Sequence, residues 1–145
     1  MRLKVKRMDD RAQIPTKVHN DDAGYDIATI EGYFLKPNET YMFRTGLKLQ
    51  IERDNDDFHN YYIQLKERSS LGKKGIGLRA GVLDFSYTGE CLVLLTNHSD
   101  KAYQVLPGDR IAQAVIQRVE SIPVYEVVEL QDTPRSENGF GSSGR

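Results

Sequence analysis

The chain has 145 residues, with 20 Lys or Arg against 21 Asp or Glu, so its formal net charge is −1. This length is typical of one domain with a buried core. The lack of a basic excess argues against nucleic-acid binding, and no apolar stretch reaches the ~18 residues of a membrane span. One cysteine, Cys91, lies in an apolar run. A lone thiol in such a run predicts a cytoplasmic protein in a reducing cell interior, which is the host cell if a virus encodes it.

Short apolar or alternating runs separated by turn residues account for most of the chain. They are rich in Tyr, Val, Ile, Leu and Thr, and the turn signals recur at intervals of about 8–14 residues, which predicts an all-β sandwich or jelly roll. The best helix candidate is "RSSLGKKG" (68–75), with one or two turns and a serine as N-cap. The runs expected as strands are "LKVKR" (3–7), "TGLKLQI" (45–51), "YYIQLK" (61–66), "CLVLLT" (91–96), "AYQVL" (102–106), "IAQAVI" (111–116) and "PVYEVVEL" (123–130).

Three further features bear on organisation. The run "RDNDD" (53–57) predicts a solvated hairpin tip. The runs 91–96 and 111–116 are almost continuously apolar, so both faces of these strands need cover, and association of subunits would provide it. From Asp132 the composition turns polar and rich in glycine. We therefore expect a β-domain over 1–131 and a flexible C-terminal segment over 132–145.

Five segments place glycine next to a functional group, and each allows two interpretations. In "DAGYDI" (22–27), Asp26 follows a turn at Gly24 and either caps a loop or faces Mg²⁺ or a water bound to it. In "RSSLGKKGI" (68–76), Arg68 and the two following serines form either a capped turn or a phosphate cradle. No nucleotide-binding "GxxxxGK[ST]" pattern is present, which excludes that class of phosphate-binding loop.

The other three segments lie in the second half of the chain. "GVLDFSYTGE" (81–90) predicts a hairpin whose edge exposes main-chain groups that could read a base, with Asp84 and Tyr87 close by. In "GDRIAQ" (108–113), Asp109 and Arg110 are expected to pair with neighbours, whereas Gln113 needs polar partners if it is buried. The tail "RSENGFGSSGR" (135–145) carries an aromatic between two glycines and is either disordered or a closing lid.

Taken together and in this order, the five segments resemble those of the trimeric dUTP diphosphatases (deoxyuridine triphosphatases), and the resemblance extends from Asp22 to Gly144. Four positions, Leu71, Ser86, Asn138 and Ser143, depart from the usual pattern of that family. The resemblance implies a β-jelly-roll, or distorted β-barrel, that assembles as a homotrimer with three sites at subunit interfaces. The first, second and fourth segments would come from one subunit, the 81–90 hairpin from a second, and the tail from the third.

The resemblance also implies an activity, the Mg²⁺-assisted hydrolysis of dUTP to dUMP and pyrophosphate. This reaction would limit uracil incorporation into DNA and supply dUMP for dTMP synthesis. Asp84 would be the general base that activates the attacking water, Gln113 would fix that water or an α-phosphate oxygen, and Asp26 would hold Mg²⁺ through water. The substrate-binding residues would be Arg68, Ser69 and Ser70 for phosphates, Gly81, Val82 and Leu83 for uracil, Tyr87 for the sugar, and Arg135, Phe140, Gly141, Ser142 and Ser143 from the lid.

Three alternatives are a related enzyme, a regulatory protein and an inert assembly. A dCTP deaminase would share the fold and a segment similar to "RSSLG", but it needs an additional acid near the base. A regulatory protein could use its nucleotide-loaded shape to dock a partner, for example near 53–57. An inert trimeric jelly roll would leave the five segments unexplained.

Overall fold

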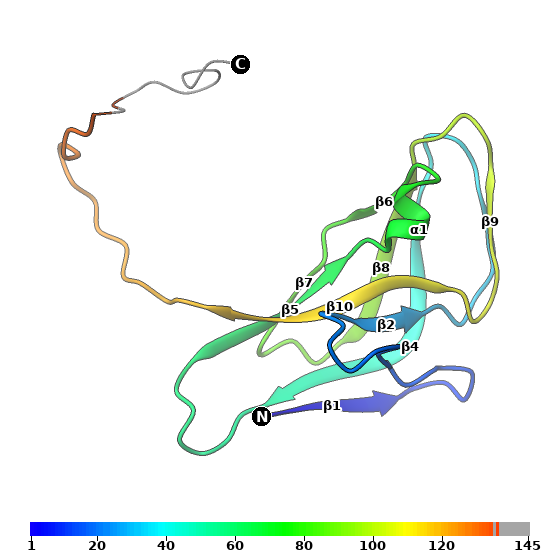
Figure 1. Cartoon of the computed structure of the whole chain (residues 1–145), viewed down its shortest axis with the longest axis horizontal. Helices are drawn as coiled ribbons and strands as arrows, with labels where there is room; N and C mark the ends of the chain where they lie inside the picture. Colours follow the sequence, from blue (N-terminus) through cyan, green and yellow to red (C-terminus); the bar gives the residue numbers. More distant parts are fainter. Residues whose placement is uncertain (135, 137–145) are drawn as a thin grey trace.

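A computed structural model defines the fold, and it describes residues 1–134 and 136. In these residues the chain forms strands and one single-turn helix (Figure 1), which confirms the all-β jelly-roll prediction. The elements are β1 (Arg2–Arg7), β2 (Tyr25–Ala28), β3 (Tyr33–Leu35), β4 (Thr40–Glu52), β5 (Asn60–Lys66), α1 (Ser69–Gly72), β6 (Ile76–Arg79), β7 (Val82–Asp84), β8 (Glu90–Asn97), β9 (Tyr103–Val105) and β10 (Arg110–Val119).

The strands form two four-stranded sheets and a two-stranded ribbon. The first sheet has the order β1-β4-β8-β6, the second β2-β10-β5-β7, and the ribbon pairs β3 with β9. Every pairing between these strands is antiparallel. We call the second sheet the site sheet, because the candidate functional residues lie on it and beside it.

Alternation along the strands separates the core from the outer faces. In β5, Ile63 and Leu65 are buried, whereas Tyr62 and Gln64 point the other way. The largest fully buried side chains include Phe43, Leu47, Val93 and Ile111, which come from strands of both sheets. The core therefore fills the space between the sheets, as binary patterning of half-buried strands predicts.

The predictions of hairpins at 53–57 and at 81–90 are both wrong. The loop 53–59 joins β4 of the first sheet to β5 of the site sheet, so it crosses between sheets instead of reversing within one. The segment 81–90 also changes sheets, because β7 pairs with β5 and β8 pairs with β4 and β6. Turn residues show where a chain changes direction, but strand pairing is decided by packing over the whole sheet.

The helix and the last expected strand also differ from prediction in detail. Helix α1 makes one turn, but Arg68 occupies the N-cap position and no side chain caps the helix. Residues 123–130 form no strand, and the chain after β10 runs away from the sheets (Figure 1). Apolar side chains there stay exposed, including Val124 at 95 % and Val128 at 101 %. A run with strand composition needs a partner strand, and the described part of this chain offers it none.

In the described part of the chain, no helix has the length and apolar character required to cross a bilayer.

Candidate functional site

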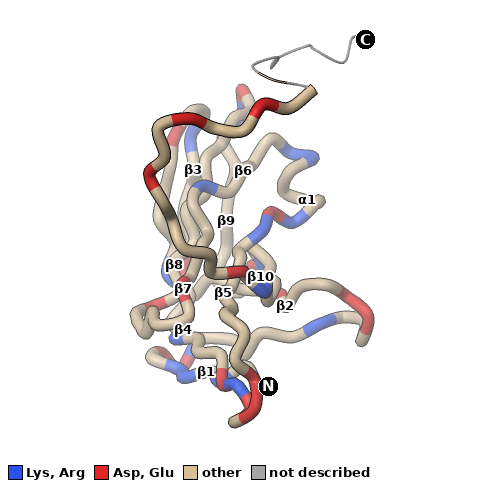
Figure 2. The backbone as a smooth tube through the Cα atoms, turned by 90° about the vertical axis from the view of Figure 1, so that its left-hand side faces the viewer, with Lys and Arg blue, Asp and Glu red and all other residues tan. Residues whose placement is uncertain are grey.

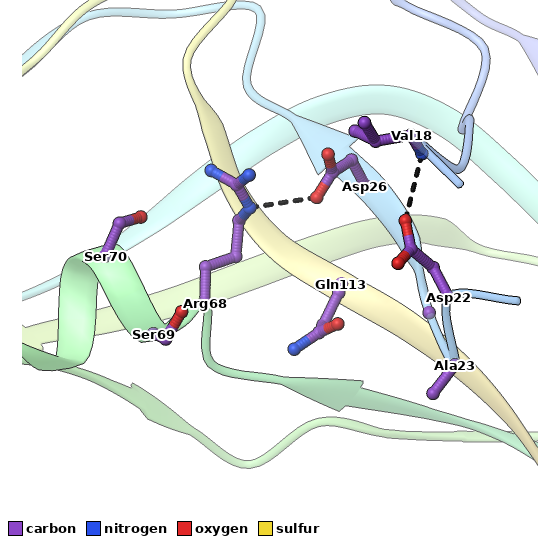
Figure 3. Close-up of a pocket in the computed structure, with 9 residues that line it drawn as sticks. Val18, Asp22, Ala23, Asp26, Arg68, Ser69, Ser70 and Gln113 are labelled. Atoms are coloured by element: carbon purple, nitrogen blue, oxygen red, sulfur yellow. Dashed lines mark hydrogen bonds and ion pairs between the residues drawn. The ribbon is translucent and has the colours of Figure 1, made fainter.

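A cavity of about 280 Å³ opens where the first, second and fourth glycine-containing segments meet (Figure 3). These segments come from the loop before β2, from the start of α1 and from β10, three regions distant in the sequence. The cavity therefore brings together Asp26, Arg68, Ser69, Ser70 and Gln113, as predicted. Its full lining is Val18, Asp22, Ala23, Gly24, Asp26, Arg68, Ser69, Ser70 and Gln113.

Asp26 is held by two arginines. Arg68 Nε donates to Asp26 Oδ1 at 2.9 Å and Arg110 Nη1 donates to Oδ2 at 3.0 Å, while Arg68 Nη1 donates to the Arg110 carbonyl at 3.2 Å. The Asp26 side chain is only 14 % exposed. Figure 3 shows the Arg68 and Asp26 side chains pointing toward each other across β10. The closed set of contacts fixes the carboxylate and spreads its charge over two cations.

Gln113 has the polar partner that its place in an apolar run requires. Its Nε2 donates to the Glu67 carbonyl at 2.8 Å. In the site sheet it lies directly opposite Asp26 on one side and Lys66 on the other. Directly opposite residues share one face of a sheet, so Gln113 and Asp26 both project outward over the cavity. The amide oxygen of Gln113 makes no hydrogen bond within the described part of the chain.

Sequence reasoning missed two residues of this region. Asp22 Oδ2 accepts from the Val18 and His19 amides at 3.1 and 2.8 Å, so it shapes the loop that forms one wall of the cavity. Arg110 was expected only to pair with neighbours. It does pair, but its partner Asp26 lies 84 positions away, and no local pattern in the sequence indicates such a contact.

Asp84 and Tyr87 lie outside this cavity. Asp84 ends β7, the edge strand of the site sheet, and stands opposite Tyr62. Asp84 and Asp26 share the outer face of that sheet, but they are three strands apart and four residues apart along the strands. Spacings of ~4.8 Å between strands and ~3.3 Å per residue put their backbones about 20 Å apart. One protomer therefore does not bring the two carboxylates to one reacting atom.

The edge of β7 presents free main-chain groups. Leu65 N donates to the Gly81 carbonyl at 2.7 Å, which makes this a hydrogen-bonded pair. Hydrogen-bonded and non-hydrogen-bonded pairs alternate along an antiparallel ladder. The main-chain groups of Leu83 therefore face β5, whereas the amide and carbonyl of Val82 point away from β5, toward the open edge of the sheet. Of the three residues expected to bind uracil, Val82 thus directs its main-chain groups to the open edge, whereas Gly81 and Leu83 are engaged with β5, and the predicted hairpin is absent.

The Tyr87 ring lies on the backbone of Gly89. A Cβ on Gly89 would overlap the ring, and the Tyr87 hydroxyl donates to the Glu90 carbonyl at 3.0 Å. The residue is 42 % exposed, so part of its surface remains accessible. The remaining predicted residues, Arg135, Phe140, Gly141, Ser142 and Ser143, lie outside the described residues.

The described side chains fit a metal held mainly by other ligands. Among residues 1–134 and 136, no three His, Cys, Asp or Glu side chains gather as a cage for an ion. Two carboxylates, Asp22 and Asp26, line the polar cavity, and such a small set suits Mg²⁺, which keeps several waters and is usually bound through one or two carboxylates plus phosphate oxygens. Both oxygens of Asp26 already accept from arginines, so this carboxylate would reach the ion through water.

Comparison with known proteins gives a consistent result. The dUTPase family model matches residues 10–144. The chain is 40 % identical to a deoxyuridine 5'-triphosphate nucleotidohydrolase of Nautilia profundicola over the full length of both, and 39 % identical to that of Clostridium novyi over 99 % of each. Its fold is similar to that of the Staphylococcus bacteriophage 80alpha dUTPase with dUPNHPP, with a TM-score of 0.88 and 27 % identity over 99 % of each chain. The chain belongs to the dUTPase family.

Proposed function

We propose that this protein hydrolyses dUTP to dUMP and pyrophosphate in sites that neighbouring protomers of a homotrimer build together. The observation that carries the proposal is the cavity in which Asp26, Arg68, Ser69, Ser70 and Gln113 converge. Membership of the dUTPase family, whose curated relatives are named dUTP nucleotidohydrolases, supports the choice of substrate over dCTP. It also favours an enzyme over a purely regulatory protein.

The position of Asp84 supports a site that is shared between protomers. Asp84 and Asp26 lie about 20 Å apart on one face of one sheet, by the strand spacings given above. A second copy can bring its Asp84 to the first copy's cavity, because both groups face outward on accessible surfaces. Contacts that place one patch of each subunit on a different patch of the next form a ring when the rotation between subunits closes, and a rotation of a third of a turn gives a trimer.

The outer face of the first sheet is also apolar at its centre and would be buried by contact with another protomer. Leu92 and Leu94 alternate along β8 with the buried Cys91, Val93 and Leu95, so both faces of this strand are apolar. Met42, opposite Leu94 on β4, is 52 % exposed. An apolar outer face at the centre of a sheet is typical of a subunit interface.

The segment after β10 would extend onto another protomer. It carries Glu120, Glu126, Glu129 and Asp132 and no basic residue between positions 120 and 134 (Figure 2). Its apolar side chains have no partner among the described residues of its own chain. We expect it to lead the tail of a third protomer to the site, where Arg135, Ser142 and Ser143 would meet the terminal phosphate and Phe140, next to Gly141, would stack on uracil.

The chemistry is an in-line displacement at the α-phosphorus. Asp84 would take a proton from a water as its oxygen bonds to phosphorus, while the bond from phosphorus to the bridging oxygen breaks and pyrophosphate leaves. Gln113 would orient that water through its free amide oxygen. Arg68, Ser69 and Ser70 would bind phosphate oxygens. Mg²⁺, when bound, would neutralise phosphate charge, and Asp26 would hold its water shell.

Specificity would come from β7 and the residues after it. The outward main-chain groups of Val82 can hydrogen-bond the uracil edge, and a site that pairs such groups rejects mispaired bases strongly. A 5-methyl group would clash with that edge, which would exclude thymidine nucleotides. The Tyr87 ring under the sugar would leave no room for a 2′-hydroxyl. The reaction would limit the incorporation of uracil into DNA and would supply dUMP for dTMP synthesis.

The test is pyrophosphate release with Mg²⁺ from dUTP, UTP, dTTP and dCTP, using the full chain and its Asp84→Asn variant. We expect strong preference for dUTP and a loss of at least about a hundredfold in kcat for Asp84→Asn, with nucleotide binding retained. Ammonia release from dCTP, or near-normal turnover by the variant, would reject the proposal.

A further inference from the structure

A second cavity, of about 320 Å³, adjoins the first, and most of its lining residues have no role in the function proposed above. Arg68 and Ser70 line both cavities, so the two are neighbours. The second extends from the end of α1 to the ribbon strand β9 and the start of β10. Its lining is Arg68, Ser70, Leu71, Lys74, Tyr103, Gly108, Asp109, Arg110 and Ile111.

The two cavities differ in charge. The first is lined by two carboxylates, Asp22 and Asp26, and one cation, Arg68. The second is lined by three cations, Arg68, Lys74 and Arg110, and one carboxylate, Asp109. One oxygen of Asp109 is already engaged, because Oδ2 accepts from the Leu106 amide at 2.8 Å. The second cavity is therefore the more favourable of the two for a group with several negative charges.

Lys74 is fixed at the wall of this cavity. Its Nζ lies 3.3 Å from the Tyr103 hydroxyl and 4.9 Å from the centre of the Tyr103 ring. Within residues 1–134 and 136 it forms no ion pair, whereas Arg68 and Arg110 both pair with Asp26. An ammonium held by an aromatic ring and a hydroxyl, without a counter-charge, is available to an anion.

We propose that the second cavity is a subsite for the terminal phosphates of the nucleotide and for the pyrophosphate that leaves, with Lys74 as a ligand and Tyr103 as the residue that positions it. The proposal rests on the proposed function above. The three cations of the second cavity favour the charge-rich end of a triphosphate, and Arg68 and Ser70 connect that cavity to the first one. The polyphosphate thus passes Arg68 and ends at Lys74.

The experiment compares the binding of three probes, dUMP, pyrophosphate and dUpNHpp, to the full chain by isothermal titration calorimetry. The variants are Lys74→Gln, Tyr103→Phe and, as the matched control, Lys73→Gln. Lys73 is the exposed neighbour of Lys74 and does not line either cavity. Tyr103→Phe keeps the ring that packs on the core and removes only the hydroxyl.

We expect Lys74→Gln to lower the affinity for pyrophosphate and for dUpNHpp about tenfold, since a charge-assisted hydrogen bond contributes on the order of 1.5 kcal/mol to binding. Tyr103→Phe should weaken both by a smaller factor. Neither variant should change dUMP affinity, and Lys73→Gln should change nothing. The dependence of pyrophosphate binding on salt should also become less steep in Lys74→Gln.

Three outcomes overturn the subsite. They are unchanged pyrophosphate and dUpNHpp affinity in Lys74→Gln, an equal loss of dUMP affinity, and an equal effect of Lys73→Gln. The proposed function fails separately, if the unmodified chain releases no pyrophosphate from dUTP. A Lys74-dependent affinity for pyrophosphate in such a chain would still support the anion subsite.

Discussion

Gly24 and Gln113 face each other with no room for another carbon atom. A Cβ on Gly24 would lie 2.7 Å from Gln113 Oε1 and 3.0 Å from Gln113 Cβ. The position of the amide oxygen that would orient the attacking water therefore depends on the absence of a side chain at position 24. The glycine of the first segment and the glutamine of the fourth act as one unit.

Gly24→Ala should lower kcat/KM for dUTP by about tenfold to a hundredfold, because a small misplacement of a positioning group is costly in catalysis. The amide end of Gln113 can move, but its Cβ, at 3.0 Å, moves only with the backbone of β10, so the thermal midpoint should fall as well. Gly72→Ala is the control, since nothing lies within 4 Å of a Cβ there. Steady-state kinetics of both variants check the prediction, and normal turnover by Gly24→Ala would contradict it.

Gly89→Ala should move the Tyr87 ring, because the added Cβ would overlap it. If this ring excludes the 2′-hydroxyl, the ratio of kcat/KM for dUTP over UTP should fall by about tenfold or more. Tyr87→Phe keeps the ring and loses only the hydrogen bond to the Glu90 carbonyl, so it should retain the selectivity. An unchanged ratio in Gly89→Ala would place sugar selection elsewhere.

Cys91 should be inert in the folded protein. It is 1 % exposed, and burial raises the pKa of its thiol to about 12, so almost no thiolate exists at pH 8. A thiol-specific reagent at pH 8 should label the native protein far more slowly than the protein in denaturant. Comparable labelling rates would show that β8 opens readily or that the thiol is accessible.

Glu39 should contribute to the loss of stability in acid. The Tyr33 hydroxyl, at 2.6 Å, and the Lys36 amide, at 2.8 Å, lower the pKa of Glu39. A lowered pKa stabilises the fold above the unfolded value of ~4.3, and this contribution is lost as the pH falls through the folded value. The thermal midpoint of Glu39→Gln should therefore fall less between pH 7 and pH 3 than that of the unmodified chain. Parallel pH profiles would refute this.

Most strands could be predicted from runs of apolar residues that were either alternating or nearly continuous. The alternating run 61–66 becomes β5, and the nearly continuous run 111–116 lies within β10. Pairing was less predictable. The turn residues at 53–57 and 81–90 suggested hairpins, but both segments cross between sheets, because the arrangement of strands depends on contacts across the whole core.

In the candidate site, too, local patterns predicted some features, whereas features that depend on strand pairing could not be predicted. Asp26, Arg68, Ser69, Ser70 and Gln113 could be predicted together, since their segments resemble an ordered set of motifs. The second arginine on Asp26 could not, because Arg110 reaches it only after β2 and β10 pair. The apolar run 123–130 has the composition of a strand but finds no partner strand in the part of the chain that the structure describes. If another copy supplies that partner, as proposed above, the local pattern of one copy cannot indicate it.

The most direct test of shared sites is the activity of mixed trimers. Asp84→Asn and Gln113→Ala are each expected to be nearly inactive alone. After they are unfolded and refolded together in equal amounts, an intact cavity of one variant can meet an intact Asp84 of the other. Random assembly should restore about a quarter of the unmodified activity. Activity no greater than that of the separately refolded variants would contradict the claim that two protomers build each site.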